Sequence, residues 1–190
     1  MNNIIVLCGQ SGGGKDSLAK LLSDRLGYSF VVSHTSRPMR VGESEGNPYW
    51  FVTLEGFYAI MSNDGFIEYR KYNTLVNNIP ATWYYGVAKS AIDNSKSYVV
   101  VLDVQGMKDF KAHFGDRVRS FYIEVSDETR KERAMSRGSF DDTEWNRRLL
   151  DDAIVFKDKS IFDNLKTVDE LDTVLIDLKF KILPVIEMFF

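Results

Sequence analysis

The chain has 190 residues, 44% of them hydrophobic, which is enough to bury one substantial core without covalent cross-links. Its formal net charge of -3 would repel a polyphosphate backbone, so we expect no nucleic-acid partner without a local basic patch. No run approaches the roughly 18 apolar residues of a membrane span, and no basic flank precedes the first apolar stretch, so we expect neither membrane insertion nor secretion.

The only cysteine, Cys8, lies in an apolar run, which we interpret as a buried strand. Disulfides within the chain are therefore impossible, and a reducing, cytoplasmic location is the simpler expectation. The two histidines, His34 and His113, lack metal-ligand spacing, so a zinc site is not expected.

The first predicted element is a strand over residues 4–8, because a short continuous apolar run is typical of a strand covered on both faces. Leucines then recur at helical spacing from Leu18 to Leu26, and Gly27 follows as a stop signal. The order is therefore strand, glycine loop, helix.

Two later apolar runs, residues 97–102 and 121–125, predict further buried strands, and each precedes a polar, helix-favouring stretch. This alternation favours an α/β fold with a parallel sheet. Between about residues 34 and 97, aromatic-rich short strands indicate an inserted lobe. Near the end, Thr167 begins a capping box ahead of an apolar stripe from Leu171 to Ile182, which predicts a final helix.

The loop after the first strand fits the pattern G-x-x-x-x-G-K, in which backbone N–H groups and a helix N-terminus hold phosphates. Its position between a buried strand and an amphipathic helix is the context that the motif requires. We predict that ATP binds here, at Gly9, Gln10, Ser11, Gly12, Gly13, Gly14, Lys15, Asp16 and Ser17.

Asp16 stands where this motif usually has a hydroxyl residue that serves magnesium. Two interpretations remain open. Asp16 either binds Mg²⁺ directly or through water, or it is a favourable charge in the first helical turn while Ser17 or water serves the metal.

Residues 33–43, Ser-His-Thr-Ser-Arg-Pro-Met-Arg-Val-Gly-Glu, resemble the guanylate kinase pattern S-x-T-T/S-R-x-x-R-x-G-E. Five more segments continue the resemblance in the family's order: 49–52, 65–69, 84–86, 103–106 and 133–138. The resemblance to the guanylate kinase family extends to about residue 155. It implies a single domain with a P-loop NTPase three-layer fold. The core would comprise about 1–33, 98–126 and 151–190, the monophosphate lobe about 34–97, and a short helical lid about 127–150.

The resemblance also implies roles for individual residues. Arg37 and Arg40 would hold the acceptor's phosphate with Tyr49 and Tyr85, and Glu68 would read the guanine edge. Ser33 is a further candidate for contacting guanine O6.

The lid arginines Arg133, Arg137 and Arg148 would span the donor and acceptor phosphates, and Asp103 would lie near the reaction centre. Guanidinium groups suit this task because they bind phosphate oxygens in pairs and keep their charge. With Lys15 and Arg37 these residues form the predicted catalytic set. Other charges in this part of the chain are interpreted as surface groups: Lys131, Arg147, Asp151 and Asp152.

The chain departs from the family pattern at three places. Val87 stands where the family normally has Ser or Thr, and extra residues lie near Asn73 to Thr82. Val101 stands where an acidic residue is common. The first two departures concern which acceptor base is recognised, and the third concerns how magnesium is bound.

The resemblance implies ATP-dependent phosphorylation of a nucleoside monophosphate, with GMP or dGMP as acceptor, ATP as donor and Mg²⁺ as cofactor. The expected partners are small-molecule nucleotides, and the oligomeric state is not specified. One alternative is a deoxynucleoside monophosphate or sugar-phosphate kinase of related fold. Another is a non-catalytic guanylate kinase-like binding module. Glu68 argues against a sugar phosphate, and Lys15 with the matched arginines argues against a pure binding module.

Overall fold

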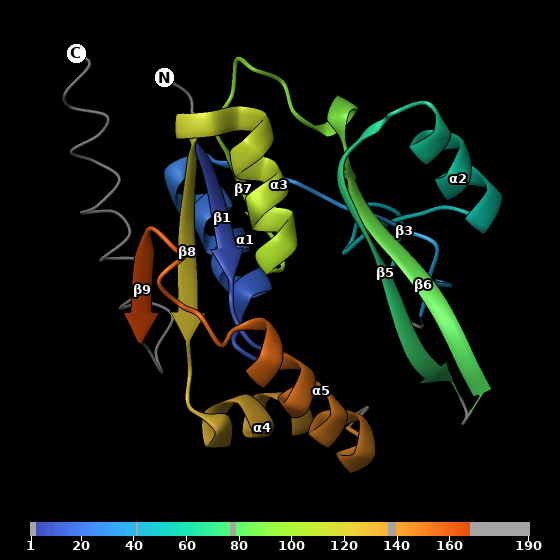
Figure 1. The fold of residues 1–190 in the computed structure, drawn as a ribbon, viewed down its shortest axis with the longest axis vertical. Coiled ribbons are helices and arrows are strands. Elements are labelled where there is room, and N and C mark those ends of the chain that lie inside the picture. The colour runs from blue at the N-terminus through green and yellow to red at the C-terminus, as the bar shows by residue number, and fades with distance from the viewer. Residues whose placement is uncertain (1–2, 41, 77–78, 137–139, 168–190) are drawn as a thin grey trace.

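The structure is a computed structural model that describes residues 3–40, 42–76, 79–136 and 140–167. Its elements form two sheets that lie side by side, with two helices below the first (Figure 1). In chain order the elements are β1(Ile4–Cys8), α1(Lys15–Leu26), β2(Ser29–Phe30), β3(His34–Thr35), β4(Trp50–Phe51), α2(Leu54–Ser62), β5(Phe66–Val76), β6(Ile79–Ala88), η1(Lys89–Ala91), β7(Tyr98–Val101), α3(Val104–Phe114), η2(Gly115–Arg117), β8(Val118–Glu124), α4(Asp127–Met135), α5(Asp142–Val155) and β9(Asn164–Thr167).

The first sheet has five parallel strands in the order β2-β7-β1-β8-β9. Successive residues of β1 face opposite sides, so Ile4 packs in one apolar cluster with Phe110 of α3. Ile5 packs in a second cluster with Leu18 of α1. Helices therefore cover both faces, and the predicted three-layer α/β fold with a parallel sheet is confirmed.

The edge of this sheet differs from the sequence-based prediction. β8 begins at Val118, three residues before the predicted run, although it includes the polar Ser120. Ser120 is fully buried, and its polar groups are satisfied because its N–H and hydroxyl both donate to Asp163, at 2.7 and 2.8 Å. β9 was not predicted. The predicted capping residue Thr167 ends β9, and the apolar stripe from Leu171 lies outside the described residues.

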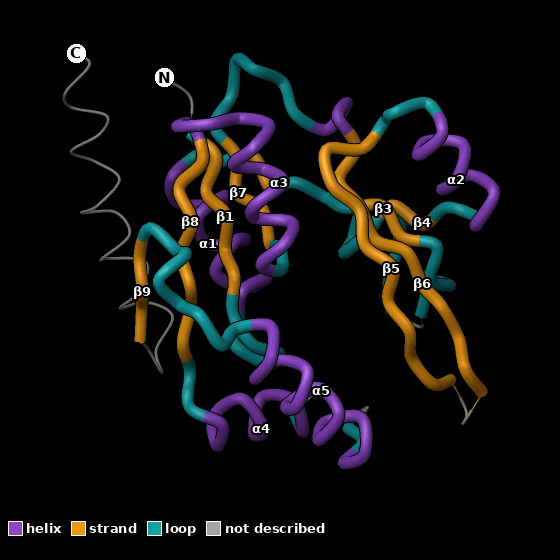
Figure 2. Tube along the Cα trace, viewed as in Figure 1, coloured by secondary structure: helices purple, strands orange, loops and turns teal. Residues whose placement is uncertain are grey.

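The second sheet is mixed, in the order β4-β3-β6-β5. β5 and β6 form a long antiparallel hairpin whose pairing continues from Phe66 with Ala88 to Val76 with Ile79. The extra residues near 73–82 therefore lengthen both strands instead of forming a loop. The free end of the hairpin points toward the lower part of the molecule, where α5 lies (Figure 2).

Helices α4 and α5 follow β8 at the carboxyl end of the parallel sheet (Figure 1). Each begins at a polar cap: the Ser126 hydroxyl accepts the N–H of Thr129, and the Asp141 carboxylate accepts the N–H of Glu144. Across the ranges given above, every helix is too short or too polar to span a membrane.

Candidate active site

The loop between β1 and α1 requires glycine because it runs against two neighbouring backbones. A Cβ added to Gly9 would lie 2.4 Å from the carbonyl oxygen of Ile123 in β8. Gly12 has a φ of +80°, and a Cβ there would lie 2.7 Å from the carbonyl oxygen of Arg130 in α4. The loop is therefore fixed between β8 and α4, directly before the N-terminus of α1, as phosphate binding requires.

Lys15 opens α1 and folds back over the loop. Its ammonium group donates to the Gln10 carbonyl at 2.9 Å. Burial lowers the pKa of Lys15, while the carboxylates of Asp16 and Asp152 oppose that shift. Asp16 and Ser17 lie exposed in the same helical turn. Lys15 is thus held at the loop with acidic groups nearby that favour its charged form.

Arg37 is 5% exposed and lies among aromatic rings of the second sheet. Its guanidinium carbon is 5.6 Å from the Tyr49 ring centroid and 5.4 Å from that of Phe51. Burial, with the charge of Asp16 next, raises the pKa of Tyr49 to about 12. Tyr85 packs edge-on against Tyr49 at 5.5 Å. The structure thus brings together three of the residues predicted to hold the acceptor's phosphate.

Glu43 binds the side chain of Arg37 and the main chain of Arg40, the two arginines of the predicted clamp. One carboxylate oxygen accepts from the Arg37 guanidinium at 2.8 Å, and the other accepts the backbone N–H of Arg40 at 2.8 Å. Burial opposes the charge of Arg37, yet Glu43 outweighs it and raises the pKa of Arg37. Glu43 was part of the matched motif, but the sequence assigned it no role.

Glu68 is 7% exposed, and its Oε2 lies near the first turn of α3, where a Cβ added to Gly106 would be 3.4 Å away. Its Oε1 accepts the backbone N–H of Val87 at 3.1 Å. Burial raises the pKa of Glu68 to about 7, while Arg70 opposes the shift and Asp103 adds to it. Ser33, directly before β3, is half-buried, and its carbonyl accepts the N–H of Trp50 at 2.9 Å.

Arg70 connects Glu68 to Asp103, a link that the sequence did not indicate. Its guanidinium lies 4.0 Å from Glu68 and 3.5 Å from Asp103, and it also pairs with Asp109 of α3. Asp103 caps α3 by accepting the N–H of Gly106 at 2.7 Å. The predicted base reader, Glu68, and the predicted reaction-centre carboxylate, Asp103, are therefore joined by one half-buried guanidinium.

A cavity of about 350 Å³ lies where the glycine loop, the second sheet and the helices α4 and α5 meet. It is lined by Ser11, Gly12, Arg40, Thr74, Ala134, Phe140, Asp141, Glu144, Trp145 and Arg148. The loop, one clamp arginine and one lid arginine predicted from sequence thus share a single cavity. Arg133 is half-buried in the last turn of α4, and Arg137 lies outside the described residues.

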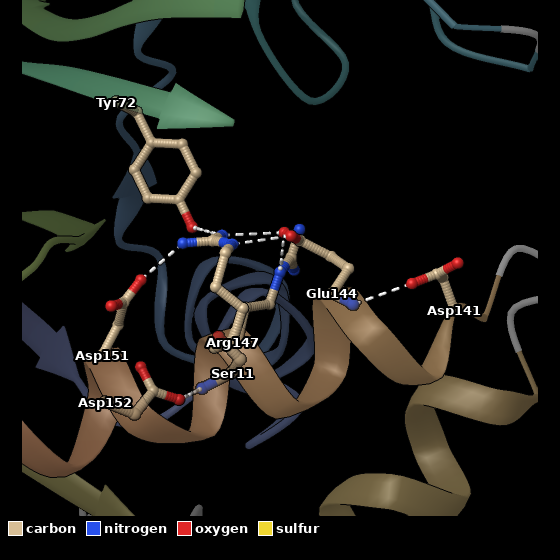
Figure 3. A network of polar contacts seen from close by, with 8 residues as sticks. Ser11, Tyr72, Asp141, Glu144, Arg147, Asp151 and Asp152 are labelled. Atoms are coloured by element: carbon tan, nitrogen blue, oxygen red, sulfur yellow. Dashed lines mark hydrogen bonds and ion pairs between the residues drawn. The ribbon is translucent and has the colours of Figure 1, made fainter. Parts of the chain in front are cut away.

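Asp152 was interpreted as a surface charge, and this interpretation is wrong. Its carboxylate is 14% exposed and accepts the N–H of Ser11 at 2.7 Å (Figure 3). The fully buried Arg130 donates to the Ser11 carbonyl at 3.0 Å and lies 3.7 Å from Asp152. Two buried charges therefore tie the glycine loop to α4 and α5. Neither residue stands out in the sequence, because both occur in charged helical stretches.

Arg147 is also more than a surface charge. It binds Tyr72 of β5 and Glu144 and Asp151 of its own helix (Figure 3). The spacing of three and four residues along α5 is a signal that could have indicated the helical pairs. Lys131 is exposed, as predicted for a surface charge, and its ammonium group lies 3.6 Å from the exposed carboxylate of Asp142.

Within the described ranges, no three Asp, Glu, His or Cys side chains gather as a set of metal ligands. A magnesium ion bound with nucleotide phosphates needs only one or two protein carboxylates, however. The exposed carboxylate of Asp16, one residue after Lys15, fits that limited requirement.

Comparisons with known proteins agree with this geometry. The family profile described as guanylate kinase matches residues 1–183. A guanylate kinase of Francisella tularensis subsp. holarctica (strain LVS) is 39% identical over 132 residues, and the match covers 65% of each chain, just under two thirds of that relative's length. A guanylate kinase of Legionella pneumophila (strain Paris) is 35% identical over 153 residues, covering 77% of this chain and 69% of its own.

Among solved structures, the guanylate kinase from Anaplasma phagocytophilum superposes with a TM-score of 0.68 at 25% identity. That superposition covers 98% of this chain and 87% of the other. The profile match, the sequence relatives and the shared fold agree, and the chain belongs to the guanylate kinase family.

Proposed function

We propose that this chain transfers the terminal phosphoryl group of ATP to GMP or dGMP. The observation that carries this proposal is the cavity shared by the glycine loop, Arg40 and Arg148. A donor phosphate held by the loop and an acceptor phosphate held by Arg40 would meet there, next to a lid arginine. Membership of the guanylate kinase family supports the same reaction.

In the proposed step, an oxygen of the acceptor's phosphate attacks the terminal phosphorus of ATP. The bond from that phosphorus to the bridging oxygen breaks, and ADP leaves with the electron pair. Such a step needs little covalent help, so catalysis depends on alignment and on positive charge around the transferred oxygens. The protein supplies that charge from Lys15, from the clamp Arg37 and Arg40, and from Arg148. Arg133 and Arg137 are assigned the same role from their motif.

We propose ATP binding along Gly9 to Ser17, with Asp16 as the protein's ligand for Mg²⁺. When bound, Mg²⁺ would neutralise charge on the donor phosphates. The alternative, in which Asp16 only favours the helix N-terminus, makes a different prediction that is tested below. Asp103 is proposed to lie near the reaction centre, and its carboxylate caps α3 and lies 3.5 Å from Arg70.

We propose that Glu68 selects the acceptor base. An ionised carboxylate can accept hydrogen bonds from guanine N1–H and from the exocyclic amine, whereas adenine presents an acceptor nitrogen and is rejected. Ser33, Tyr49 and Tyr85 complete the proposed acceptor site. Thymine keeps a ring N–H, so dTMP is the expected second choice.

We further propose that the molecule works as three parts: a core (about 1–33, 98–126 and 151–190), a monophosphate lobe (about 34–97) and a lid (about 127–150). The second sheet belongs to the lobe, and α4 with most of α5 belongs to the lid. With Cys8 buried in β1 as its only cysteine, the chain suits a reducing, cytoplasmic location.

An assay that couples ADP release to NADH oxidation tests the proposal. Wild-type protein receives equal ATP and magnesium with GMP, dGMP, AMP, CMP, dTMP or a sugar phosphate. We expect the highest kcat/KM for GMP or dGMP, with dTMP next. A higher value for AMP or CMP than for both guanine nucleotides would overturn the role of Glu68. No turnover with any acceptor would favour the binding-module alternative.

A further inference from the structure

A series of aromatic contacts leads away from the proposed acceptor phosphate site toward the lid. The ring centroids of Tyr49 and Tyr85 lie 5.5 Å apart. Tyr72 packs edge-on against Tyr85, at 6.5 Å and an interplanar angle of 88°. Tyr72 lies on β5 directly before the extra residues near 73–82, and Thr74, two residues further on, lines the central cavity. The hairpin thus extends from the clamp into the space beside the lid.

Tyr72 contacts the lid through Arg147 of α5. The Arg147 guanidinium donates to the Tyr72 hydroxyl at 2.6 Å, and its carbon lies 5.3 Å from the Tyr72 ring centroid. Figure 3 shows the tyrosine of the strand directed at this guanidinium above the helix. The contact joins residues that are 75 positions apart, and it combines a hydrogen bond with a cation–π interaction.

Arg147 in turn shares Glu144 with Arg148. The Glu144 carboxylate accepts from the Arg147 Nε at 2.7 Å and from the Arg148 Nε at 2.8 Å. The hydrogen bond from Arg147, with that from Arg148, lowers the pKa of Glu144 to about 2 although burial opposes the shift. The carboxylate therefore stays charged near neutral pH, and its position depends on both guanidinium groups. Arg148 is the arginine of this group that lines the cavity.

We propose that Tyr72 and Arg147 are positioning residues that hold Arg148 toward the transferred phosphoryl group when the acceptor lobe meets the lid. This inference rests on the proposed kinase reaction and adds residues outside the family motifs that position one lid arginine. Tyr72 and Arg147 act through Glu144 rather than on a nucleotide. Tyr72 and Asp151 hold Arg147, and Arg147 and Arg148 both bind the Glu144 carboxylate, so Arg147 restricts where that carboxylate can hold Arg148.

The first test compares Tyr72→Phe with Tyr58→Phe. Both substitutions remove one hydroxyl from the lobe: the Tyr58 hydroxyl on α2 donates to that of Tyr84 at 3.0 Å, whereas the Tyr72 hydroxyl accepts from Arg147 of the lid. We expect Tyr72→Phe to lower kcat for GMP about three- to tenfold, the range for a partly exposed hydrogen bond to a charged group. KM for GMP and the melting temperature should stay at wild-type values, and Tyr58→Phe should leave kcat unchanged. Wild-type kcat in Tyr72→Phe would overturn the inference.

A double-mutant cycle with Arg147→Met separates coupling from independent effects. If the two residues act as one unit, adding Tyr72→Phe to Arg147→Met lowers kcat by less than twofold further. Losses that multiply in the double variant would contradict the proposed path. If the melting temperature of Tyr72→Phe falls so far that part of the protein is unfolded at the assay temperature, the lost rate would reflect a structural role of Tyr72 instead.

A second measurement is independent of catalysis. Amide hydrogen exchange over residues 142–155 should be faster in Tyr72→Phe than in wild type, and unchanged in Tyr58→Phe. Equal exchange in all three proteins would overturn the contact whatever the acceptor proves to be. Faster exchange in Tyr72→Phe together with a wild-type protein that does not phosphorylate GMP would instead reject the proposed function alone.

Discussion

The carboxylate of Glu68 accepts the backbone N–H of Val87, at 3.1 Å, across the paired strands β5 and β6. Val87 stands where the family normally has a hydroxyl side chain, and its own side chain is fully buried. The main chain at this position therefore orients the proposed base reader, while the side chain packs in the apolar cluster that contains Ile4 and Phe110. The absence of a hydroxyl at position 87 would leave guanine O6 without one hydrogen-bond donor. It does not change how Glu68 is held, because that contact uses the backbone N–H.

Restoring that donor should improve the use of GMP. Val87→Thr keeps the branched shape and adds a hydroxyl, so we expect kcat/KM for GMP to rise about two- to tenfold over wild type, the worth of one neutral hydrogen bond. Val87→Ala controls for lost packing and should not raise it. An unchanged kcat/KM in Val87→Thr would show that another group, such as Ser33, already serves O6.

Acceptor binding should weaken as the pH falls. Burial raises the pKa of Glu68 to about 7 against the opposing charge of Arg70, so the carboxylate becomes protonated between about pH 8 and 6. The protonated group accepts fewer hydrogen bonds from guanine, and KM for GMP should rise about five- to tenfold over that interval. Glu68→Gln is the control: its side chain at position 68 does not titrate, whereas the phosphate of GMP titrates equally in both assays. Identical pH profiles for the two proteins would contradict the assignment.

The link between Asp152 and Ser11 should support both stability and the glycine loop. Asp152→Asn leaves the buried Arg130 with the exposed Asp127 as its remaining ion pair, and we expect the free energy of unfolding to fall by about 1–3 kcal/mol. KM for ATP should rise as well, since the loop amide loses a charged acceptor. Asp151→Asn removes an exposed charge next to it and should cost about 0–1 kcal/mol. Denaturation midpoints that match for wild type and Asp152→Asn would refute the structural role.

The two interpretations of Asp16 differ in a magnesium titration. If its carboxylate serves the metal, Asp16→Ala should raise the magnesium concentration for half-maximal rate far more than it raises KM for ATP at saturating magnesium. A charge that only favours the helix N-terminus should leave the titration unchanged and lower stability by about 0.3–1 kcal/mol. Asp24, further along the same helix, provides a matched Asp→Ala control.

The parts of the site that the sequence predicted are local in the chain. The glycine loop spans consecutive residues between β1 and α1, and Arg37, Arg40 and Glu43 lie within one short segment, so their pattern is visible without the fold. The fold class could be predicted from the apolar runs that form β1, β7 and β8. Strands that are apolar on both faces and separated by helices must lie in a sheet with helices packed on each face.

The contacts that the sequence did not reveal join distant and chemically ordinary residues. Ser11 and Asp152 are 141 positions apart, and Tyr72 and Arg147 are 75 apart. Charged residues on helices are usually exposed, so nothing local distinguishes Arg130 or Asp152 from solvated neighbours. The lengthened hairpin was visible only as extra residues near 73–82. Its direction toward α5 depends on strand pairing and on where the helices pack.

The most direct test of the central claim follows the phosphoryl group itself. Wild-type protein is incubated with GMP and ATP labelled with ³²P at the terminal phosphate, and the nucleotides are separated. We expect the label in GDP, in equal amount to the ADP formed. Lys15→Met should stay folded and produce little labelled GDP, because this lysine faces the loop and supports phosphate charge. ATP consumed with the label found only in inorganic phosphate, or no ATP consumed at all, would contradict the proposal.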